Sequence, residues 1–193
     1  MHPAFLHDRY VLKRQILALT GKFRIFNPTG QLVLFSQQKM FRLREDIRVF
    51  TDESMGQELL HIQARQILDF SAAYDVIDTT YQSKVGVLRR KGFRSLMRDE
   101  WEVLDNLDQP IGILCEDSLG LALLRRFLLG SLLPQNYDVV IDGQRVADLR
   151  QRFHLFGYVL DIDFSMDTAR RLDHRLGIAA AILLGTIEGK QRS

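Results

Sequence analysis

The sequence predicts a mainly β protein: a closed antiparallel β-barrel of about 12 strands around a central hydrophobic C-terminal α-helix, with one short inserted helix. Three observations lead to this fold class. A hairpin pattern occurs five times, two further segments alternate in the same way, and an apolar stretch near the C-terminus must be buried. The 193 residues contain no Gly/Ser/Pro-rich linker, so residues 1–193 are expected to form a single domain.

The five hairpin segments alternate polar and apolar residues on both sides of a turn signal. The turns include Asn-Pro-Thr-Gly, Asp-Asn-Leu-Asp and Asp-Gly. Period-two alternation is typical of strands, and these turn residues favour tight reversals, so each segment predicts a hairpin. The segments begin at Phe23, Ile47, Tyr74, Trp101 and Tyr137. Closing such a series into a barrel removes its exposed edges.

Two more strands are expected over Tyr10–Leu17 and Phe156–Phe164, which completes the set of twelve. The inserted helix is expected near Ser118–Leu129, in the longest interval between hairpins. A barrel of this size is too wide for its own side chains to fill, so it needs a plug or a cavity.

The stretch Leu176–Ile187 reads LGIAAAILLGTI and contains no charged residue. As a helix it rises about 18 Å, whereas a bilayer core measures about 30 Å, so a membrane span is excluded by length. A helix that is apolar all round must be buried all round, which predicts that this helix fills the barrel axis. We expect Ser165 or Asp167 to be its N-cap. Small residues at every fourth position let a wall approach the helix closely: Gly177, Ala181 and Gly185.

Composition and motifs argue against several classes of function. The net charge of +2 gives no indication of nucleic-acid binding. The single cysteine, Cys115, excludes an internal disulfide and is interpreted as an inert strand residue. No histidine has zinc-type spacing, and no phosphate-binding or nucleophile motif occurs. We therefore expect no catalytic residues, no metal, no cofactor and no enzyme activity, and a cytoplasmic location with peripheral membrane association.

The segment Lys84–Arg98 reads KVGVLRRKGFRSLMR, with six basic residues and no acid. Its cations at the strand end and following loop predict a site for an anionic ligand, because arginine binds phosphate bidentately. The predicted residues are Arg89, Arg90, Lys91 and Arg94. The alternative is a solvated hairpin whose charges pair with neighbouring acids.

The inserted segment 118–133 is strongly apolar and carries two adjacent arginines. It can lie on a membrane or bind a protein partner, which makes it a predicted interaction helix. Its predicted residues are Leu124, Arg125, Arg126 and Leu128. The alternative is a helix that caps the open end of the barrel with its arginines in water.

Polar side chains alternate late in the chain, at Asp161, Asp163, Ser165 and Asp167. This spacing is reminiscent of a calcium loop, but an EF-hand requires glycine at its sixth position and an acid at its twelfth. Those positions hold Met166 and Leu172. The alternation is therefore better explained by outward positions of a strand.

Several stretches resemble the LURP-one-related branch of the tubby C-terminal-like fold, which is also similar to phospholipid scramblases. They are QQKMFRLREDIRVF, ELLHIQARQILDFSAAYDVID, VGVLRRKGFRSLMRDEWEV and the final helix, and the resemblance covers roughly residues 8–189. It implies a barrel threaded by a hydrophobic helix. Tubby domains bind phosphoinositides through basic surface residues, and scramblases are associated with lipid movement and calcium. The Pro-rich and Cys-rich scramblase segments are absent from this sequence.

These observations together predict a non-enzymatic binding domain that docks to phosphoinositides or other anionic lipid surfaces. Three alternatives remain open. The first is a protein-interaction or structural module that uses the 118–133 helix, and the second is a scramblase-related protein without a membrane span. The third is an unrecognised enzyme, which would require a polar pocket with a perturbed acid or base.

Overall fold

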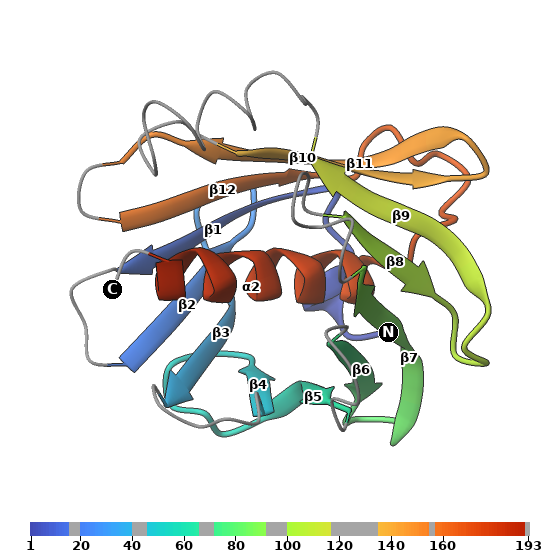
Figure 1. Ribbon diagram of the computed structural model, residues 1–193. Helices are drawn as coiled ribbons and strands as arrows, with labels where there is room; N and C mark the ends of the chain where they lie inside the picture. The colour runs from blue at the N-terminus through green and yellow to red at the C-terminus, as the bar shows by residue number, and fades with distance from the viewer. Residues whose placement is uncertain are drawn as a thin grey trace.

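The computed structural model describes residues 1–15, 20–39, 46–65, 72–91, 100–116, 135–154 and 157–191. Twelve antiparallel strands form a closed barrel in which each strand pairs with its neighbours in sequence, and β1 closes on β12 (Figure 1). The predicted barrel and central helix are confirmed. The expected inserted helix lies outside the described residues.

The first six strands are β1 (Arg9–Gln15), β2 (Thr20–Phe26), β3 (Leu32–Lys39), β4 (Asp46–Phe50), β5 (Glu58–Ala64) and β6 (Ala73–Asp78). The next six are β7 (Ser83–Arg90), β8 (Glu100–Leu104), β9 (Pro110–Glu116), β10 (Asn136–Ile141), β11 (Gln144–Arg152) and β12 (Gly157–Asp163). A short 3-10 helix, η1 (Pro3–Phe5), precedes them, and α2 (His174–Gln191) follows.

The five predicted hairpins are all present, and their turns form for identifiable local reasons. Asn27 Oδ1 accepts hydrogen bonds from the backbone N–H groups of Thr29 and Gln31 in the β2–β3 turn. Asp105 Oδ1 does the same in the β8–β9 turn, as short polar side chains commonly do. Asp142 and Gly143 both have positive φ, at 49° and 73°, which suits a two-residue hairpin.

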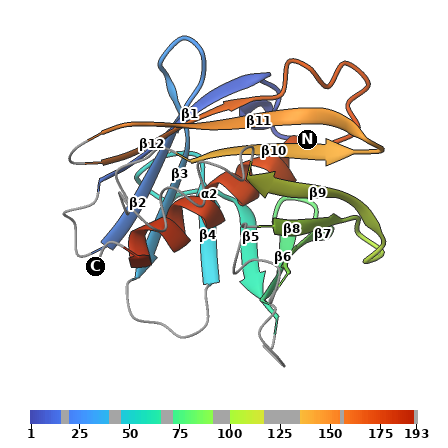
Figure 2. The ribbon, with the colours of Figure 1, turned by 45° about the horizontal axis from the view of Figure 1, so that its top comes forward.

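Helix α2 runs along the barrel axis, as Figures 1 and 2 show, and residues 176–186 are buried. Close contacts with the barrel wall require small residues at Gly177 and Gly185. A Cβ atom on Gly177 would lie 2.5 Å from Phe164 Cζ, and one on Gly185 would lie 2.8 Å from Phe23 Cε1. Larger residues at these two positions would push the helix against the wall.

The predicted N-cap of this helix is wrong. Helix α2 begins at His174, and the residue before it, Asp173, accepts a hydrogen bond from Arg175 N at 2.9 Å. Asp167 instead accepts from the backbone N–H groups of Arg171 and Leu172 in the preceding turn. Residues 164–173 connect the end of β12 to the start of the helix, and the sequence pattern did not reveal the length of this connection.

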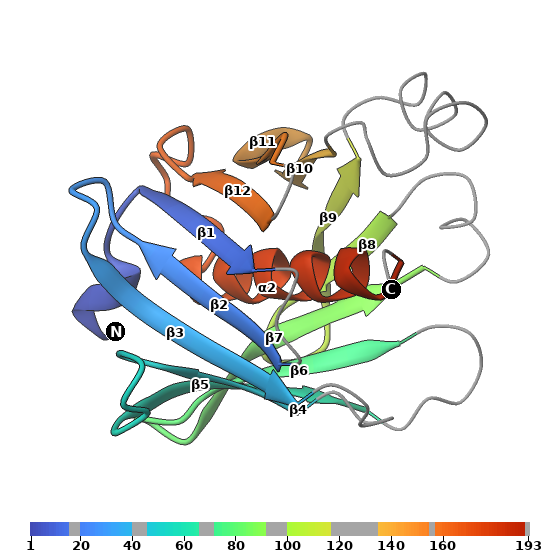
Figure 3. The ribbon, with the colours of Figure 1, turned by 90° about the vertical axis from the view of Figure 1, so that its left-hand side faces the viewer.

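Because neighbouring strands are antiparallel, the connections fall alternately at two ends of the barrel (Figure 3). We call one end the closed end; it contains residues 1–8, the five hairpin turns and residues 164–173. We call the opposite end the loop end; the strands that finish there are β1, β3, β5, β7, β9 and β11. Helix α2 runs from the closed end toward the loop end, since Leu176 contacts Gly86 in β7 and Gly185 lies beside Arg14, near the end of β1.

Side chains from distant parts of the sequence seal the closed end. Arg175 Nη1 lies 2.5 Å from Asp78 Oδ2, and the Asp78 side chain is only 3% exposed. His174 stacks on Phe164 at a centroid distance of 4.3 Å, and its Nδ1 lies 3.0 Å from the carbonyl oxygen of Phe5. The N-terminal segment and the start of α2 are thus joined to the strands.

Candidate functional site at the loop end of the barrel

The predicted anionic-ligand site begins on β7, at the loop end. Arg89 faces outward and pairs with Glu102 of β8, with an Nε to Oε2 distance of 2.7 Å. Lys91 Nζ lies 2.7 Å from Glu100 Oε1 and 3.6 Å from Glu102 Oε1. Two of the predicted cations therefore lie together, and two carboxylates of the neighbouring strand offset their charge.

The other two predicted cations do not join them on this surface. Arg90 lies opposite Trp101 in the strand register and shares its inward side, because consecutive strand residues face opposite ways. Arg94 lies outside the described residues. The predicted interaction-helix residues also lie outside them: Leu124, Arg125, Arg126 and Leu128.

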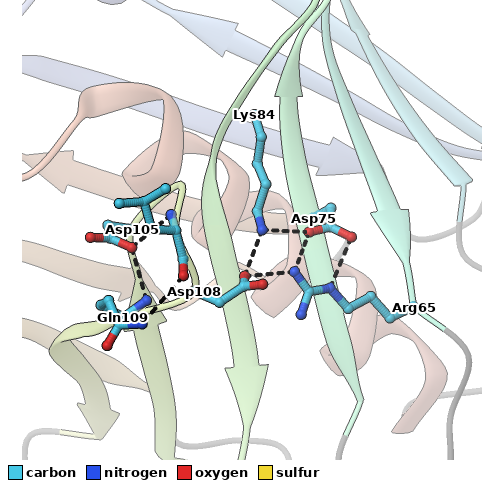
Figure 4. A network of polar contacts seen from close by, with 7 residues as sticks. Arg65, Asp75, Lys84, Asp105, Asp108 and Gln109 are labelled. Carbon is cyan, nitrogen blue, oxygen red and sulfur yellow. Dashed lines mark hydrogen bonds and ion pairs between the residues drawn. The ribbon is translucent and has the colours of Figure 1, made fainter.

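Most described arginines and lysines of the barrel surface contact a carboxylate. Figure 4 shows one such network, in which Arg65 Nη2 lies 2.7 Å from both Asp75 Oδ1 and Asp108 Oδ1. Lys84 Nζ lies 2.6 Å from Asp108 Oδ1 and 3.6 Å from Asp75 Oδ1. The hydrogen bond from Lys84, followed by that from Arg65, holds the pKa of Asp108 below its usual range. Two cations and two anions cancel, so this surface offers no net charge to a ligand.

A hollow of about 420 Å³ on the outer face of β11, β12 and β1 is also balanced in charge. It is lined in part by two ion pairs, Arg9 with Asp163 and Arg152 with Asp161.

Three cations on β1 and β2 differ from this pattern. Within the described ranges, no carboxylate lies within ion-pair distance of Lys13, Arg14 or Lys22. Lys13 and Lys22 face outward, and the Lys13 ammonium lies 5.1 Å from the centre of the Phe26 ring. Their lack of a partner has a cause in the sequence: residues 9–44 contain eight Lys and Arg residues and no Asp or Glu.

Arg14 faces the barrel interior and has a structural contact there. Its Nη1 donates a hydrogen bond to the carbonyl oxygen of Gly185 at 2.9 Å, and its guanidinium lies 5.5 Å from the Phe23 ring centre. Burial lowers the pKa of Arg14. This leaves Lys13 and Lys22 as the outward pair, called the lysine pair below.

The connections at the two ends differ in composition. The loop-end segments are 16–19, 40–45, 66–71, 92–99, 117–134 and 155–156. Each contains at least two Leu, Ile, Met or Phe residues, and together they contain six arginines and four acids. The five closed-end turns contain five acids and no Lys or Arg. At the loop end, Phe153 directly follows β11 and is 59% exposed.

A sequence model of the LURP-one-related family matches residues 32–185, which run from β3 to the buried part of α2. The chain belongs to the LURP-one-related family. Searches among curated proteins and among solved structures gave no match. The match of this LURP-one-related chain begins after the lysine pair, so β1 and β2 complete the barrel from outside the matched range.

The alternating acids of this LURP-one-related chain have protein partners. Asp161 pairs with Arg152, and Asp163 accepts from Ser165 N at 2.8 Å and pairs with Arg9. In the described ranges, no group of three or more His, Cys, Asp or Glu is arranged to hold a metal ion. Likewise, none of the helices in those ranges combines the length and apolar character needed to cross a bilayer.

Sequence reasoning selected the dense basic run on β7 and did not single out the lysine pair or Phe153. The available signal was the acid-free stretch from Arg9 to Arg44, in which basic residues are more widely spaced than in the selected run. Whether a cation has a carboxylate partner depends on which strands are neighbours, and the spacing of basic residues along the sequence does not show this.

Proposed function

We propose that this chain is a non-enzymatic binding domain that docks onto anionic phospholipid surfaces, phosphoinositides among them, with the loop end of its barrel. The contrast between the two barrel ends carries this proposal. Apolar residues interspersed with arginines suit a membrane interface, where apolar side chains enter the acyl boundary and cations meet acidic headgroups. Exposed Phe153 is an apolar side chain available at that end.

The cations predicted from the β7 sequence belong to the same proposal. Arg89 and Lys91 face outward at the loop end, and Arg94 follows them in the sequence. Their contacts with Glu100 and Glu102 reduce the charge that they can offer to a headgroup. We therefore expect them to contribute less than unpaired cations would.

Co-sedimentation of the purified chain with vesicles tests the proposal. Vesicles of neutral phospholipid, of neutral lipid with an acidic phospholipid, and of neutral lipid with a phosphoinositide are each compared at low and high salt. The expected result is binding to both acidic compositions that weakens with salt, because surface charge is screened within about 10 Å at 0.1 M ionic strength. A triple variant, R89A/K91A/R94A, is expected to bind more weakly than the unchanged chain.

Absence of binding to every vesicle at low salt would contradict the proposal. In that event the protein-interaction hypothesis becomes the better one, and the apolar segment 118–133 is the first place to test it. Leu128→Asp and Leu132→Asp would then be examined for loss of self-association or partner binding without unfolding.

A further inference from the structure

The outer face of β1 and β2 places the lysine pair on neighbouring strands. The register sets Lys13 opposite Arg24 and Arg14 opposite Phe23. Lys22 precedes Arg24 by two residues and so shares its outward face. Lys13 and Lys22 are therefore diagonal neighbours, a relation that separates residues by about 7 Å. This spacing refers to backbone positions. The Lys13 ammonium lies 5.1 Å from the centre of the Phe26 ring, on the other side of Arg24 from Lys22, so the Lys13 side chain must turn away from that ring to share one phosphate group with Lys22.

Glu53, a described acid close enough to Lys22 to be affected by its charge, is already engaged. Glu53 binds Arg24 through both oxygens, with distances of 2.6 Å from Nε and 3.1 Å from Nη2. Arg24, and more weakly Lys22, hold the pKa of Glu53 below its usual range. The carboxylate therefore neutralises Arg24 and leaves the lysine pair with positive charge to spare.

The surface beside the pair favours an extended ligand over a small ion. Across β12, Lys13 lies opposite Val159, which in turn lies opposite Arg152 of β11. Phe153 follows Arg152 and is exposed. Arg152 is paired with Asp161, so this surface adds an exposed aromatic side chain near the loop end to the two lysines, a combination that suits a membrane surface.

We infer that the lysine pair on β1 and β2 is the headgroup contact of this protein, where Lys13 and Lys22 bind the phosphate of an anionic lipid at the membrane surface. The inference rests on the proposed function and names its site. The inferred contact lies on strands that precede the region matched by the family model. It does not involve Arg89 of β7 or Lys91, which follows that strand, because both are paired with carboxylates.

The decisive experiment compares two double variants that change net charge equally. K13Q/K22Q removes the lysine pair. R170Q/R171Q removes two cations from the closed end, where their distances to Asp8 and Asp142 are 3.6 Å and 3.8 Å. Vesicle affinity is measured for both and for the unchanged chain at low salt. Urea denaturation shows that each variant is folded.

The expected result is a roughly 30-fold loss of affinity for acidic vesicles in K13Q/K22Q, since each cation at an acidic surface contributes about a factor of five. R170Q/R171Q should bind like the unchanged chain, and K13R/K22R should keep most of the affinity. Inorganic phosphate at matched ionic strength should displace the protein from vesicles no better than chloride does.

Three results would overturn the inference while leaving the proposed function standing. The first is unchanged vesicle binding in K13Q/K22Q. The second is an equal loss in both glutamine variants, which would indicate an effect of net charge. The third is full displacement by inorganic phosphate, which would indicate a site for a free anion. If the unchanged chain bound no vesicle, the proposed function and this inference would fail together.

Discussion

The two ends of the barrel use polar residues in opposite ways. At the closed end, Arg175 and Asp78 form a buried ion pair, and His174 lies 3.0 Å from the Phe5 carbonyl oxygen. At the loop end, Lys13 and Lys22 face solvent without a carboxylate partner in the described ranges. The polar contacts of the closed end hold distant segments of the chain together. The lysine pair keeps its charge available to a ligand, unlike the loop-end cations Arg89 and Lys91, which are paired with carboxylates.

Hydrophobic residues show the same contrast. The closed-end turns contain three large apolar or aromatic side chains, all exposed: Met55, Tyr81 and Leu107. They are isolated, one to a turn, which is ordinary for a protein surface. Every loop-end segment has at least two such residues, so stability and binding are expected to respond to mutation at different ends.

The largest expected effect is on stability, from Asp78→Ala. The change removes one of the two carboxylates that bind Arg175, and it removes the acceptor for Thr80 N and Tyr81 N. Arg175 keeps its contacts with Asp173. The expected loss of about 3 kcal/mol of free energy of unfolding therefore comes from the broken Asp78 contact and the two unsatisfied backbone donors together. Urea denaturation should show that loss, while vesicle affinity of the folded protein stays the same.

Asp161→Ala is the matched control, because Asp161 pairs with Arg152 at the surface. Exposed pairs contribute about 1 kcal/mol or less. Equal losses in the two variants would show that the Asp78 contact does not lock the closed end.

The next effect is a dependence of stability on pH. Burial lowers the pKa of His174, the Phe5 carbonyl opposes this, and Arg170, Asp8 and Asp173 exert smaller charge effects. The folded state thus binds the proton less well than the unfolded state. The contribution is fully present above the unfolded pKa of about 6.5 and is lost as pH falls through the lower folded value.

Urea denaturation between pH 7.5 and 5 measures this effect. The free energy of unfolding should fall toward acid with a slope approaching about 1.4 kcal/mol per pH unit from this group. His174→Phe keeps an aromatic ring against Phe164 and has no proton to bind, so its profile should be flatter. Profiles of equal slope would rule out His174 as the cause.

Most of the fold could be predicted because its signals are local. Alternation and turn residues mark each hairpin, and a twelve-residue apolar stretch without charge can only be buried. The N-cap was wrong because Asp173 becomes a cap through the length of the connection over residues 164–173, which no local pattern encodes. For a related reason, the sequence did not show which of the predicted binding residues lie together. The carboxylates of β8 offset the charges of Arg89 and Lys91, and the alternation of β7 places Arg90 on the inward side. Residues that are adjacent in the sequence therefore do not form one cluster of free cations.

The smallest expected effect compares two exposed aromatic side chains at opposite ends, Phe153 and Tyr81, which are 59% and 63% exposed. Phe153→Ala should weaken binding to acidic vesicles about fivefold, because partial insertion of a phenyl ring contributes about 1 kcal/mol. Tyr81→Ala should leave that affinity unchanged. Both should alter stability by less than about 0.5 kcal/mol, since both side chains are mostly exposed. A loss that persists in high salt, where binding through the lysine pair is screened, would show that the apolar contact acts independently of charge. Equal affinity of the two variants would mean that the exposed ring of the loop end does not reach the membrane, and would restrict docking to the outer face of β1 and β2.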